Sequence, residues 1–411
     1  MREPLILATN HTLLVTASAP PLSESEKSTP VRKFRILALA VELAIGMCGV
    51  ALMGLGVGAN RRWLDRHVLP SFLLSREMLV AIETMVRGGL AAAGASLVVF
   101  VRPAAGRALR SAPGLAVTTA AAIVLAIVAS EPLLRRVEFR PVGWLSADDE
   151  PRRQVDARLG WTLVPSRVGH ASVGGRTIDY ITDANGYRVG AQGSSVDRAQ
   201  HTMLFVGESV MFGEGLTWDE SIPAQAGAIV GIQSANLAVH GFGNDQAFLR
   251  LQAELPRFER PVAIVSLFMP TLFGRNLDHE RPHLAAGLAW QPADLSWRVQ
   301  SLLRLMVPYH RTSTIEHGIA LTREIFGATN ALARARGAVP LVVVPQFGPE
   351  SEPESVLRRR VLTGIDVPSL VIQVDPAWRL PWDRHPDARA AHAIAVAIAN
   401  RLQSEKNARA R

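Results

Sequence analysis

The chain has 411 residues, 48% of them apolar, so it is long enough for more than one domain and apolar enough for a large core together with membrane segments. Its net charge of +8 comes mostly from arginines that are scattered along the chain, without the basic stripe and interleaved aromatic residues of a nucleic-acid-binding surface. The one cysteine, Cys48, excludes a disulfide within the chain, so we expect packing to supply the stability.

Residues 1–34 are predicted to be a flexible cytoplasmic tail. The segment is mixed in composition and contains Pro20, Pro21 and a run of Ser and Glu residues. Part of it resembles a signal peptide, but Asn10 and His11 interrupt the apolar stretch that a signal peptide needs. We therefore expect the tail to remain uncleaved.

Residues 35–136 are predicted to be a membrane region with about three transmembrane helices. The candidate spans are residues 36–58, 80–101 and 113–134, each long enough to cross about 30 Å of hydrocarbon as a helix. Gly54 and Gly58 form a small-residue pair that could let another helix approach the first span, although such a lone pair more often only softens the helix. In the second span, Glu83 and Arg87 have the spacing of a helical ion pair. The alternative is a soluble protein with two long core helices.

Basic residues set the predicted orientation of these spans. One group precedes the first span and a second lies between the second and third, which puts both on the cytoplasmic side and leaves the chain after the third span outside the cytoplasm. A third group, after the first span, counts against this orientation. The groups are Arg32, Lys33 and Arg35; Arg102, Arg107 and Arg110; and Arg61, Arg62, Arg66 and Arg76.

The remaining chain is predicted to contain a β-rich segment at residues 137–200, an α/β domain at residues 201–404 and a polar tail at residues 405–411. In the α/β domain, short apolar runs without alternation are separated by helical patterns, which is typical of a parallel sheet covered on both faces. We therefore expect a three-layer α/β/α sandwich. The predicted strands are 202–207, 234–239, 262–268, 339–344 and 370–374, and the predicted helices are 244–257, 314–336, 350–362 and 386–404.

Three segments of this domain carry side chains suited to acyl transfer. Ser209 follows the first predicted strand and Gly207, at the edge where open α/β sheets bind their ligands. A second strand runs into the Gly-rich turn at residues 240–246, which supplies backbone amides. His385, in an Asp-Arg-His-Pro segment before the last helix, supplies a base.

These segments resemble the GDSL/SGNH hydrolase superfamily, in particular its bacterial members. The blocks are Val-Gly-Glu-Ser followed by Phe-Gly-Glu-Gly, then Gly-Phe-Gly-Asn-Asp-Gln, then Asp-Arg-His-Pro, in this order within residues 150–404. The resemblance implies a flavodoxin-like sandwich. It also implies that Ser209 is the nucleophile, His385 the general base and Asp383 the partner that orients His385, with Ser209 and Gly241 as oxyanion-hole donors. It implies no cofactor.

Two of these assignments have alternatives. Asp383 also suits the N-cap of the last helix. His392 is a second histidine near the C-terminus, but it falls within an Ala-rich helical pattern and is predicted to be a packed or surface residue.

The sequence departs from the family pattern at the oxyanion hole. Glu208 stands beside the serine where an Asp is common, and the third strand is followed by Pro270 and lacks the family's Asn donor. The nearest side-chain amides are Asn276 and Asn244. We predict Asn276 as the donor because it follows the third strand, although a role as a turn residue is equally compatible with its polar loop.

His279 and His283 reproduce the spelling of a zinc-protease motif, but Pro282 between them would break the helix that the motif requires. We expect no metal site here and instead expect a loop above the active site.

Three functions fit this pattern. The first is a serine hydrolase for oxygen esters, anchored in the cell (inner) membrane by several spans, with its catalytic domain in the periplasm and an ester-bearing small molecule or acylated glycan as substrate. The second is an O-acyltransferase for cell-surface glycans, which would need a membrane partner protein because three spans are too few to carry an acyl-donor transporter. The third is a non-catalytic binding protein that keeps the fold, which the missing Asn favours.

Overall fold

The computed structural model describes residues 24–58, 68–70, 76–136, 150–294, 309–381 and 385–409. The chain divides into two compact units. The helical unit consists of Met1–Gly58 and Arg87–Ile127, and the α/β unit consists of Ala59–Val86 and Val128–Arg411. The candidate catalytic residues all belong to the α/β unit.

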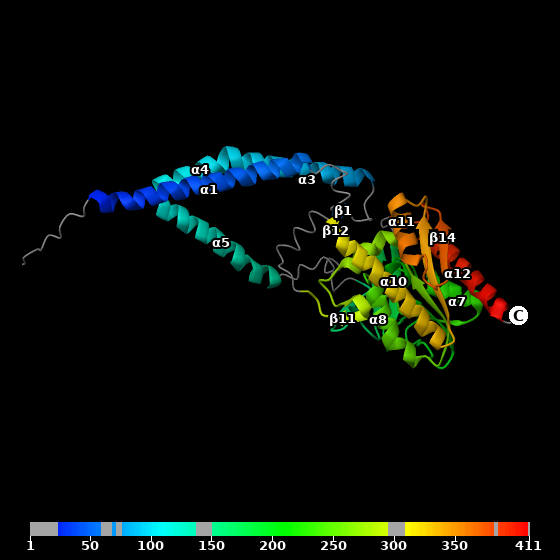
Figure 1. Cartoon of the computed structure of the whole chain (residues 1–411). Coiled ribbons are helices and arrows are strands. Elements are labelled where there is room, and N and C mark those ends of the chain that lie inside the picture. Colours follow the sequence, from blue (N-terminus) through cyan, green and yellow to red (C-terminus); the bar gives the residue numbers. More distant parts are fainter. Residues whose placement is uncertain are drawn as a thin grey trace, which may run out of the picture. The chain divides into compact units, whose positions relative to one another are not determined.

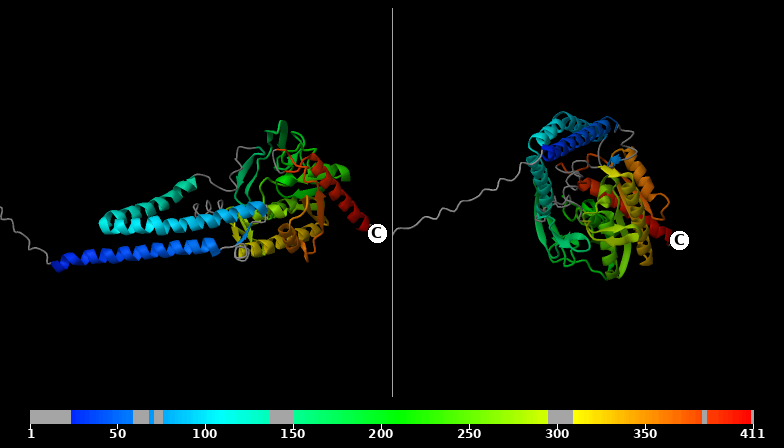
Figure 2. Two further views of the ribbon diagram at one scale, coloured as in Figure 1. Left: turned by 90° about the horizontal axis from the view of Figure 1, so that it is seen from above. Right: turned by 60° about the vertical axis from the view of Figure 1, so that its left-hand side comes forward.

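Long apolar helices dominate the first part of the chain. They are α1 (Glu24–Gly58), α3 (Arg76–Ser96), the π-helical turn η1 (Leu97–Val101), α4 (Arg102–Ser111) and α5 (Pro113–Arg136). Three stretches of the described chain are long and apolar enough to cross a membrane: Arg35–Gly58, Thr84–Ser111 and Pro113–Pro132. Figure 2 shows α1 running alongside the continuous α3, η1 and α4 helix.

Several details of this region differ from the sequence prediction. The first helix begins at Glu24, within the segment expected to be a flexible tail. The arginine-bearing loop expected between the second and third spans is instead helix α4, because its Ala-rich sequence has high helix propensity. Arg87 donates to the backbone oxygens of Gly56 and Val57, at 3.0 and 3.1 Å. The side chain of Glu83, its expected partner, lies outside the described residues.

The close helix contacts of α1 come from glycines other than those predicted. A Cβ added at Gly49 would lie 2.7 Å from the Gly94 backbone oxygen, and one at Gly56 would lie 2.7 Å from the Arg87 oxygen. A Cβ at Gly54 or Gly58 would meet nothing within 4 Å. Within the described residues the Gly54 and Gly58 pair therefore makes no close helix contact, and Gly49 and Gly56 are the glycines at the close approaches.

The α/β unit is built on an eight-stranded sheet with the order β14-β13-β9-β7-β8-β6-β5-β4. Its first five strands in this order are parallel, and β6, β5 and β4 continue the sheet in antiparallel fashion. In chain order the strands are β4 (Val168–Val173), β5 (Arg176–Thr182), β6 (Arg188–Val189), β7 (His201–Val206), β8 (Gln233–Asn236), β9 (Arg260–Leu267), β13 (Val339–Phe347) and β14 (Ser369–Val374).

The parallel strands have the flavodoxin-like arrangement. The chain enters at β7, places β8 on one side of it, and then crosses to place β9, β13 and β14 on the other side. The order of the sheet therefore reverses between β7 and β9, which is where folds of this type bind their ligands. Ser209 follows β7 directly, so it lies beside this point.

Helices cover both faces of the sheet. Figure 1 shows α8 and α10 on one side of the strands and α7 and α12 on the other. The helices are α6 (Ser209–Phe212), α7 (Ile222–Val230), α8 (Asn244–Glu254), α10 (Thr312–Ala335), α11 (Glu352–Leu362) and α12 (Ala388–Arg409). A buried cluster joins β7, β9 and β13 to side chains of α8, α10 and α12. This arrangement is the predicted three-layer α/β/α sandwich, so the fold class is confirmed.

Shorter elements complete the structure. Three two-stranded antiparallel pairs join β1 (Val68–Pro70) to β12 (Tyr309–Arg311), β2 (Arg153–Asp156) to β3 (Gly160–Leu163), and β10 (His283–Ala285) to β11 (Ala289–Gln291). Short 3-10 helices are η3 (Leu255–Arg257), η4 (Pro270–Leu277) and η5 (Ala286–Leu288).

Candidate active site

Ser209 lies at the carboxyl end of the central strand. Strand β7 is buried from Thr202 to Val206, and Gly207 and Glu208 then lead into the one-turn helix α6, which begins at Ser209. A Cβ at Gly207 would lie 3.0 Å from that of Leu267 on β9, so glycine lets the two strands stay close at this turn. The turn presents the Ser209 hydroxyl at the sheet edge while the residue is only 1% exposed.

His385 contacts this serine, although it lies near the C-terminal end of the domain's sequence. Its Nε2 lies 2.7 Å from Ser209 Oγ, across 176 residues of sequence. The backbone oxygen of His385 accepts a hydrogen bond from the Leu380 amide at 2.9 Å, which fixes the loop before α12. The fold therefore brings together the nucleophile and base that the sequence predicts, at a distance suited to proton transfer.

The other two C-terminal residues weighed in the sequence have different outcomes. Asp383 lies outside the described residues. The N-cap expected as its alternative role belongs to Asp387, whose carboxylate accepts from the amides of Arg389 and Ala390 at 2.9 and 3.0 Å. The Nδ1 of His392 lies 2.6 Å from Gln225 Oε1 on α7, so His392 is a surface residue, as predicted.

Glu208 competes with His385 for the hydroxyl proton of Ser209. Its Oε2 lies 2.5 Å from Ser209 Oγ and also accepts from Arg275 Nη1 at 3.0 Å. Because a hydroxyl has one proton, Ser209 can donate either to the Glu208 carboxylate or to His385 Nε2. Only donation to His385 makes the Ser209 oxygen a nucleophile. The Arg275 guanidinium favours this arrangement, because its ion pair with Glu208 makes that carboxylate a weaker acceptor for the serine proton.

A second acid–base pair, missed in the sequence reading, lies beside His385. Glu214 Oε2 is 3.6 Å from His385 Nε2 and forms an ion-pair contact with Nδ1 of the buried His240. The ring centroids of the two histidines are 6.4 Å apart. Glu214 falls within one of the quoted sequence blocks and His240 directly precedes another, but only the fold shows that their loops meet.

A buried arginine supports the loop that carries Glu214. Arg188 is fully buried and donates to the backbone oxygens of Phe212, Gly213 and Leu216, at 2.8, 2.7 and 2.5 Å. Its guanidinium also lies 4.9 Å from the ring centroid of Tyr180 and 4.8 Å from that of Phe212. Burial lowers the pKa of Arg188 to about 10, so it remains protonated at neutral pH.

The turn after β8 is held by the segment around β3. Gly241 has φ of +82°, a conformation that glycine adopts without strain. Trp161 Nε1 donates to the His240 oxygen at 3.0 Å. The Gln246 side chain accepts from the Gly243 amide at 3.0 Å and donates to the Leu159 oxygen at 2.6 Å. The role of Gly241 as an oxyanion donor stays a prediction.

Asn276 is placed differently from the sequence expectation. It is 4% exposed, and its side-chain amide donates to Asn244 Oδ1 at 2.9 Å and to Thr322 Oγ1 at 3.0 Å. Its Oδ1 accepts from the Asn244 amide at 2.8 Å. Both N–H groups of Asn276 are therefore used within the protein. Asn244 Nδ2 is likewise bonded to the Leu267 oxygen at 2.9 Å. This geometry fits a structural role for Asn276 better than oxyanion stabilisation.

The loop around Asn276 is further held by a buried ion pair. Arg281, 4% exposed, donates from Nη2 to Asp245 Oδ1 at 2.8 Å and to the Arg275 oxygen at 2.6 Å. The pair links the start of α8 to the chain after η4. The hydrogen bond from Arg281 to the Arg275 oxygen also fixes the backbone of Arg275, whose side chain contacts Glu208.

His279 and His283 do not form a helical zinc motif. His283 opens strand β10, and the two imidazoles stack with centroids 4.3 Å apart. Burial, and then the neighbouring His283, lower the pKa of His279, which favours the neutral form of that ring. Among the described residues no group of three or more His, Cys, Asp or Glu side chains is arranged to hold a metal ion.

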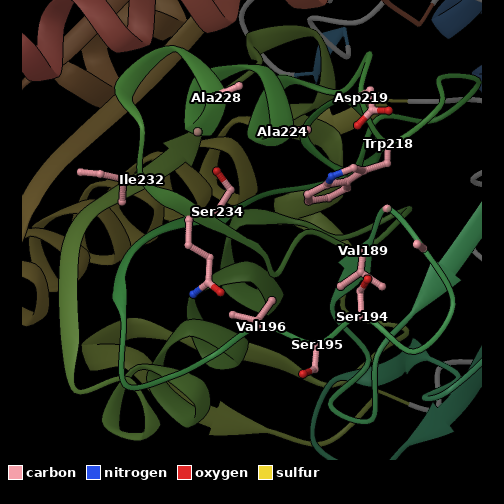
Figure 3. A pocket seen from close by; sticks show the side chains of 14 residues that line it. Val189, Ser194, Ser195, Val196, Trp218, Asp219, Ala224, Ala228, Ile232 and Ser234 are labelled. Atoms are coloured by element: carbon pink, nitrogen blue, oxygen red, sulfur yellow. The ribbon is translucent and has the colours of Figure 1, made fainter.

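Two of the cavities in the described part of the α/β unit differ in their relation to the site. A small one of about 20 Å³ is lined by Glu208, Asn244 and Asn276, among others, and is the size of a single water site. A larger one of about 520 Å³ is lined by Trp218, Asp219 and Ser234 and by residues of the loop after β6 (Figure 3). None of the predicted catalytic residues lines the larger cavity, so it is separate from the Ser209 site.

Comparison with known proteins gives only remote similarities. No protein-family profile and no curated protein matches the sequence. Among solved structures, an acetyl xylan esterase from Butyrivibrio proteoclasticus has 10% identity and a TM-score of 0.33, over 52% of this chain and 66% of the esterase. A G-D-S-L family protein described as lipolytic, from Desulfitobacterium hafniense, has 13% identity and a TM-score of 0.33, over 49% of this chain and 98% of that one.

A salicylyl-acyltransferase from a tetracycline biosynthetic pathway has 13% identity and a TM-score of 0.29, over 52% of this chain and 57% of the transferase. Because these TM-scores lie below 0.5, a functional assignment has to depend on the residues of this chain.

Proposed function

We propose that this protein is a membrane-anchored serine hydrolase that acts on oxygen esters. The observation that carries the proposal is the 2.7 Å contact between His385 Nε2 and Ser209 Oγ, formed at the carboxyl end of the central strand. A hydroxyl on a tight turn, next to a histidine, is the arrangement that nucleophilic acyl transfer requires.

The proposed reaction proceeds through an acyl-enzyme. His385 takes the proton of Ser209 as Oγ attacks the ester carbonyl, and the resulting imidazolium then protonates the departing alcohol. Water attacks the acyl-serine in the second half of the cycle, again with His385 as base, and releases the acid. The backbone N–H groups of Ser209 and Gly241 are the proposed donors to the oxyanion, and Asp383 is the proposed partner of His385 Nδ1.

Glu214 and His240 extend this machinery. The Glu214 carboxylate lies 3.6 Å from the nitrogen of His385 that faces Ser209, so it favours the imidazolium formed during each half-reaction. His240, in contact with the same carboxylate, keeps it directed toward His385. We assign both as positioning residues that act through His385.

The proposed substrates are ester-bearing small molecules or acylated glycans outside the cytoplasm. Apolar helices precede the catalytic unit, and basic residues at the start of the first candidate span favour a cytoplasmic N-terminus. Three spans would then leave the α/β unit on the periplasmic side of the membrane.

Hydrolysis of an aryl acetate by the purified full-length protein tests the proposal. We expect Ser209→Ala and His385→Ala each to abolish nearly all activity, and the double variant to be little worse than either, because the two residues act as one unit. His392→Ala is the matched control, since it removes a surface histidine from the same region. Activity of Ser209→Ala within tenfold of the parent would refute the proposal.

A further inference from the structure

A second polar site lies in the helical unit, between α1 and α4. A cavity of about 310 Å³ is lined by Glu42 of α1, by Val98 and Pro103, and by the arginines Arg102, Arg107 and Arg110. Arg110 Nη2 donates to Glu42 Oε1 at 2.6 Å. The Glu42 carboxylate neutralises Arg110, and the guanidinium groups of Arg102 and Arg107 also line the cavity.

A glycine lets the two helices approach each other closely beside this pocket. A Cβ added at Gly106 would lie 1.5 Å from Glu42 Oε1, so only glycine allows α4 to approach the Glu42 side chain. Gly106 and Leu109 are buried in α4, whereas its three arginines remain exposed. Among the residues that the structure describes, neither Arg102 nor Arg107 has an ion-pair partner.

The length of the second candidate span indicates the depth of the pocket. Thr84–Ser111 has 28 residues, or about 42 Å of helix, whereas the hydrocarbon layer is about 30 Å thick. The 18 residues before Arg102 make about 27 Å of helix, close to the thickness of that layer, so α4 begins near the level of the lipid headgroups. Unpaired arginines at that depth favour an anionic partner.

We propose that this pocket binds the phosphate of an anionic phospholipid. Arg102 and Arg107 supply planar forks of N–H donors, the geometry that suits phosphate oxygens. Glu42 neutralises and orients Arg110, which leaves an excess of positive charge for one phosphodiester. The inference rests on the proposed membrane anchoring but not on the proposed esterase activity, because none of these residues belongs to the α/β unit.

The test uses the full-length protein in a nonionic detergent and counts retained lipid by native mass spectrometry as phosphatidylglycerol or phosphatidylcholine is added. We expect the parent to prefer phosphatidylglycerol. The Arg102→Gln/Arg107→Gln variant should lose the preference, with a roughly tenfold lower affinity for each guanidinium removed. Arg35→Gln is the matched control, because it removes an exposed arginine of α1 that does not line the pocket.

A lysine double variant and a competition with inorganic phosphate complete the test. Arg102→Lys/Arg107→Lys keeps the charge but removes the forks, and it should bind phosphatidylglycerol more weakly than the parent even if the Gln variant does not fold. Inorganic phosphate at the same concentration should not compete. Equal binding of the two lipids by the parent, an unchanged preference in both double variants, or full competition by inorganic phosphate would each overturn the lipid assignment.

Discussion

At the scale of single residues, the candidate active site contains two groups that can accept the one hydroxyl proton of Ser209. Ser209 can donate to Glu208 or to His385, and Glu214 approaches the same nitrogen of His385 that faces the serine. The sequence predicted the serine and the histidine because each lies in a short recognisable block. It did not predict Glu214 and His240 as a pair, because their contact depends on how two separate loops meet.

Replacing Glu214 by glutamine should change the pH dependence of catalysis. The carboxylate favours protonated His385, so its loss should let the base become neutral at lower pH. We therefore expect the acid limb of the kcat/KM profile to move to lower pH and kcat to fall, because the imidazolium loses the nearby carboxylate. An unchanged acid limb with a lower melting temperature would mean that Glu214 has only a structural role. His392→Gln serves as the control.

Asn276→Ala should affect stability more than catalysis. The substitution removes three hydrogen bonds of a buried side chain and should lower the free energy of unfolding by about 1–3 kcal/mol. We expect kcat to stay within tenfold of the parent. Thr322→Val, which removes one partner of the same amide, should destabilise the protein similarly. A hundredfold loss of kcat without a change in melting temperature would instead restore Asn276 as an oxyanion donor.

At the scale of elements, the sequence predicted the parallel strands and the long helices, but not the short helix α7 or the pairing of β4 to β6 with the main sheet. Strand β7 and helix α10 were predicted to within about two residues, because buried parallel strands and amphipathic helices leave clear patterns. Helix α7 was missed because it is a short run of small apolar residues. Strands β4 to β6 were expected in a separate β-rich segment, but they extend the main sheet, a pairing that no local pattern encodes.

The loop between α6 and α7 should depend strongly on Arg188. In Arg188→Met, three backbone oxygens lose their buried donor, and the free energy of unfolding should fall by about 3 kcal/mol or more. Arg176→Met is a suitable comparison, because its ion pair with Glu220 is partly exposed and should contribute less than about 1 kcal/mol. Equal losses in chemical denaturation would contradict the supporting role assigned to Arg188.

At the scale of the whole molecule, we propose that the helical unit anchors the α/β unit to a membrane. Three helices have the length and composition of spans. A reporter that is active only outside the cytoplasm should be active when fused after residue 140 and inactive when fused after Arg107. The reverse pattern would place the catalytic unit in the cytoplasm and exclude surface glycans as substrates.

Covalent labelling tests most directly whether Ser209 is a nucleophile that His385 activates. The full-length protein is treated with a fluorophosphonate, and the modified residue is located by peptide mass spectrometry. We predict one adduct, on Ser209, that is absent in Ser209→Ala, strongly reduced in His385→Ala and undiminished in His392→Ala. Absence of any adduct on the folded parent protein, or an adduct on another residue, would contradict this prediction.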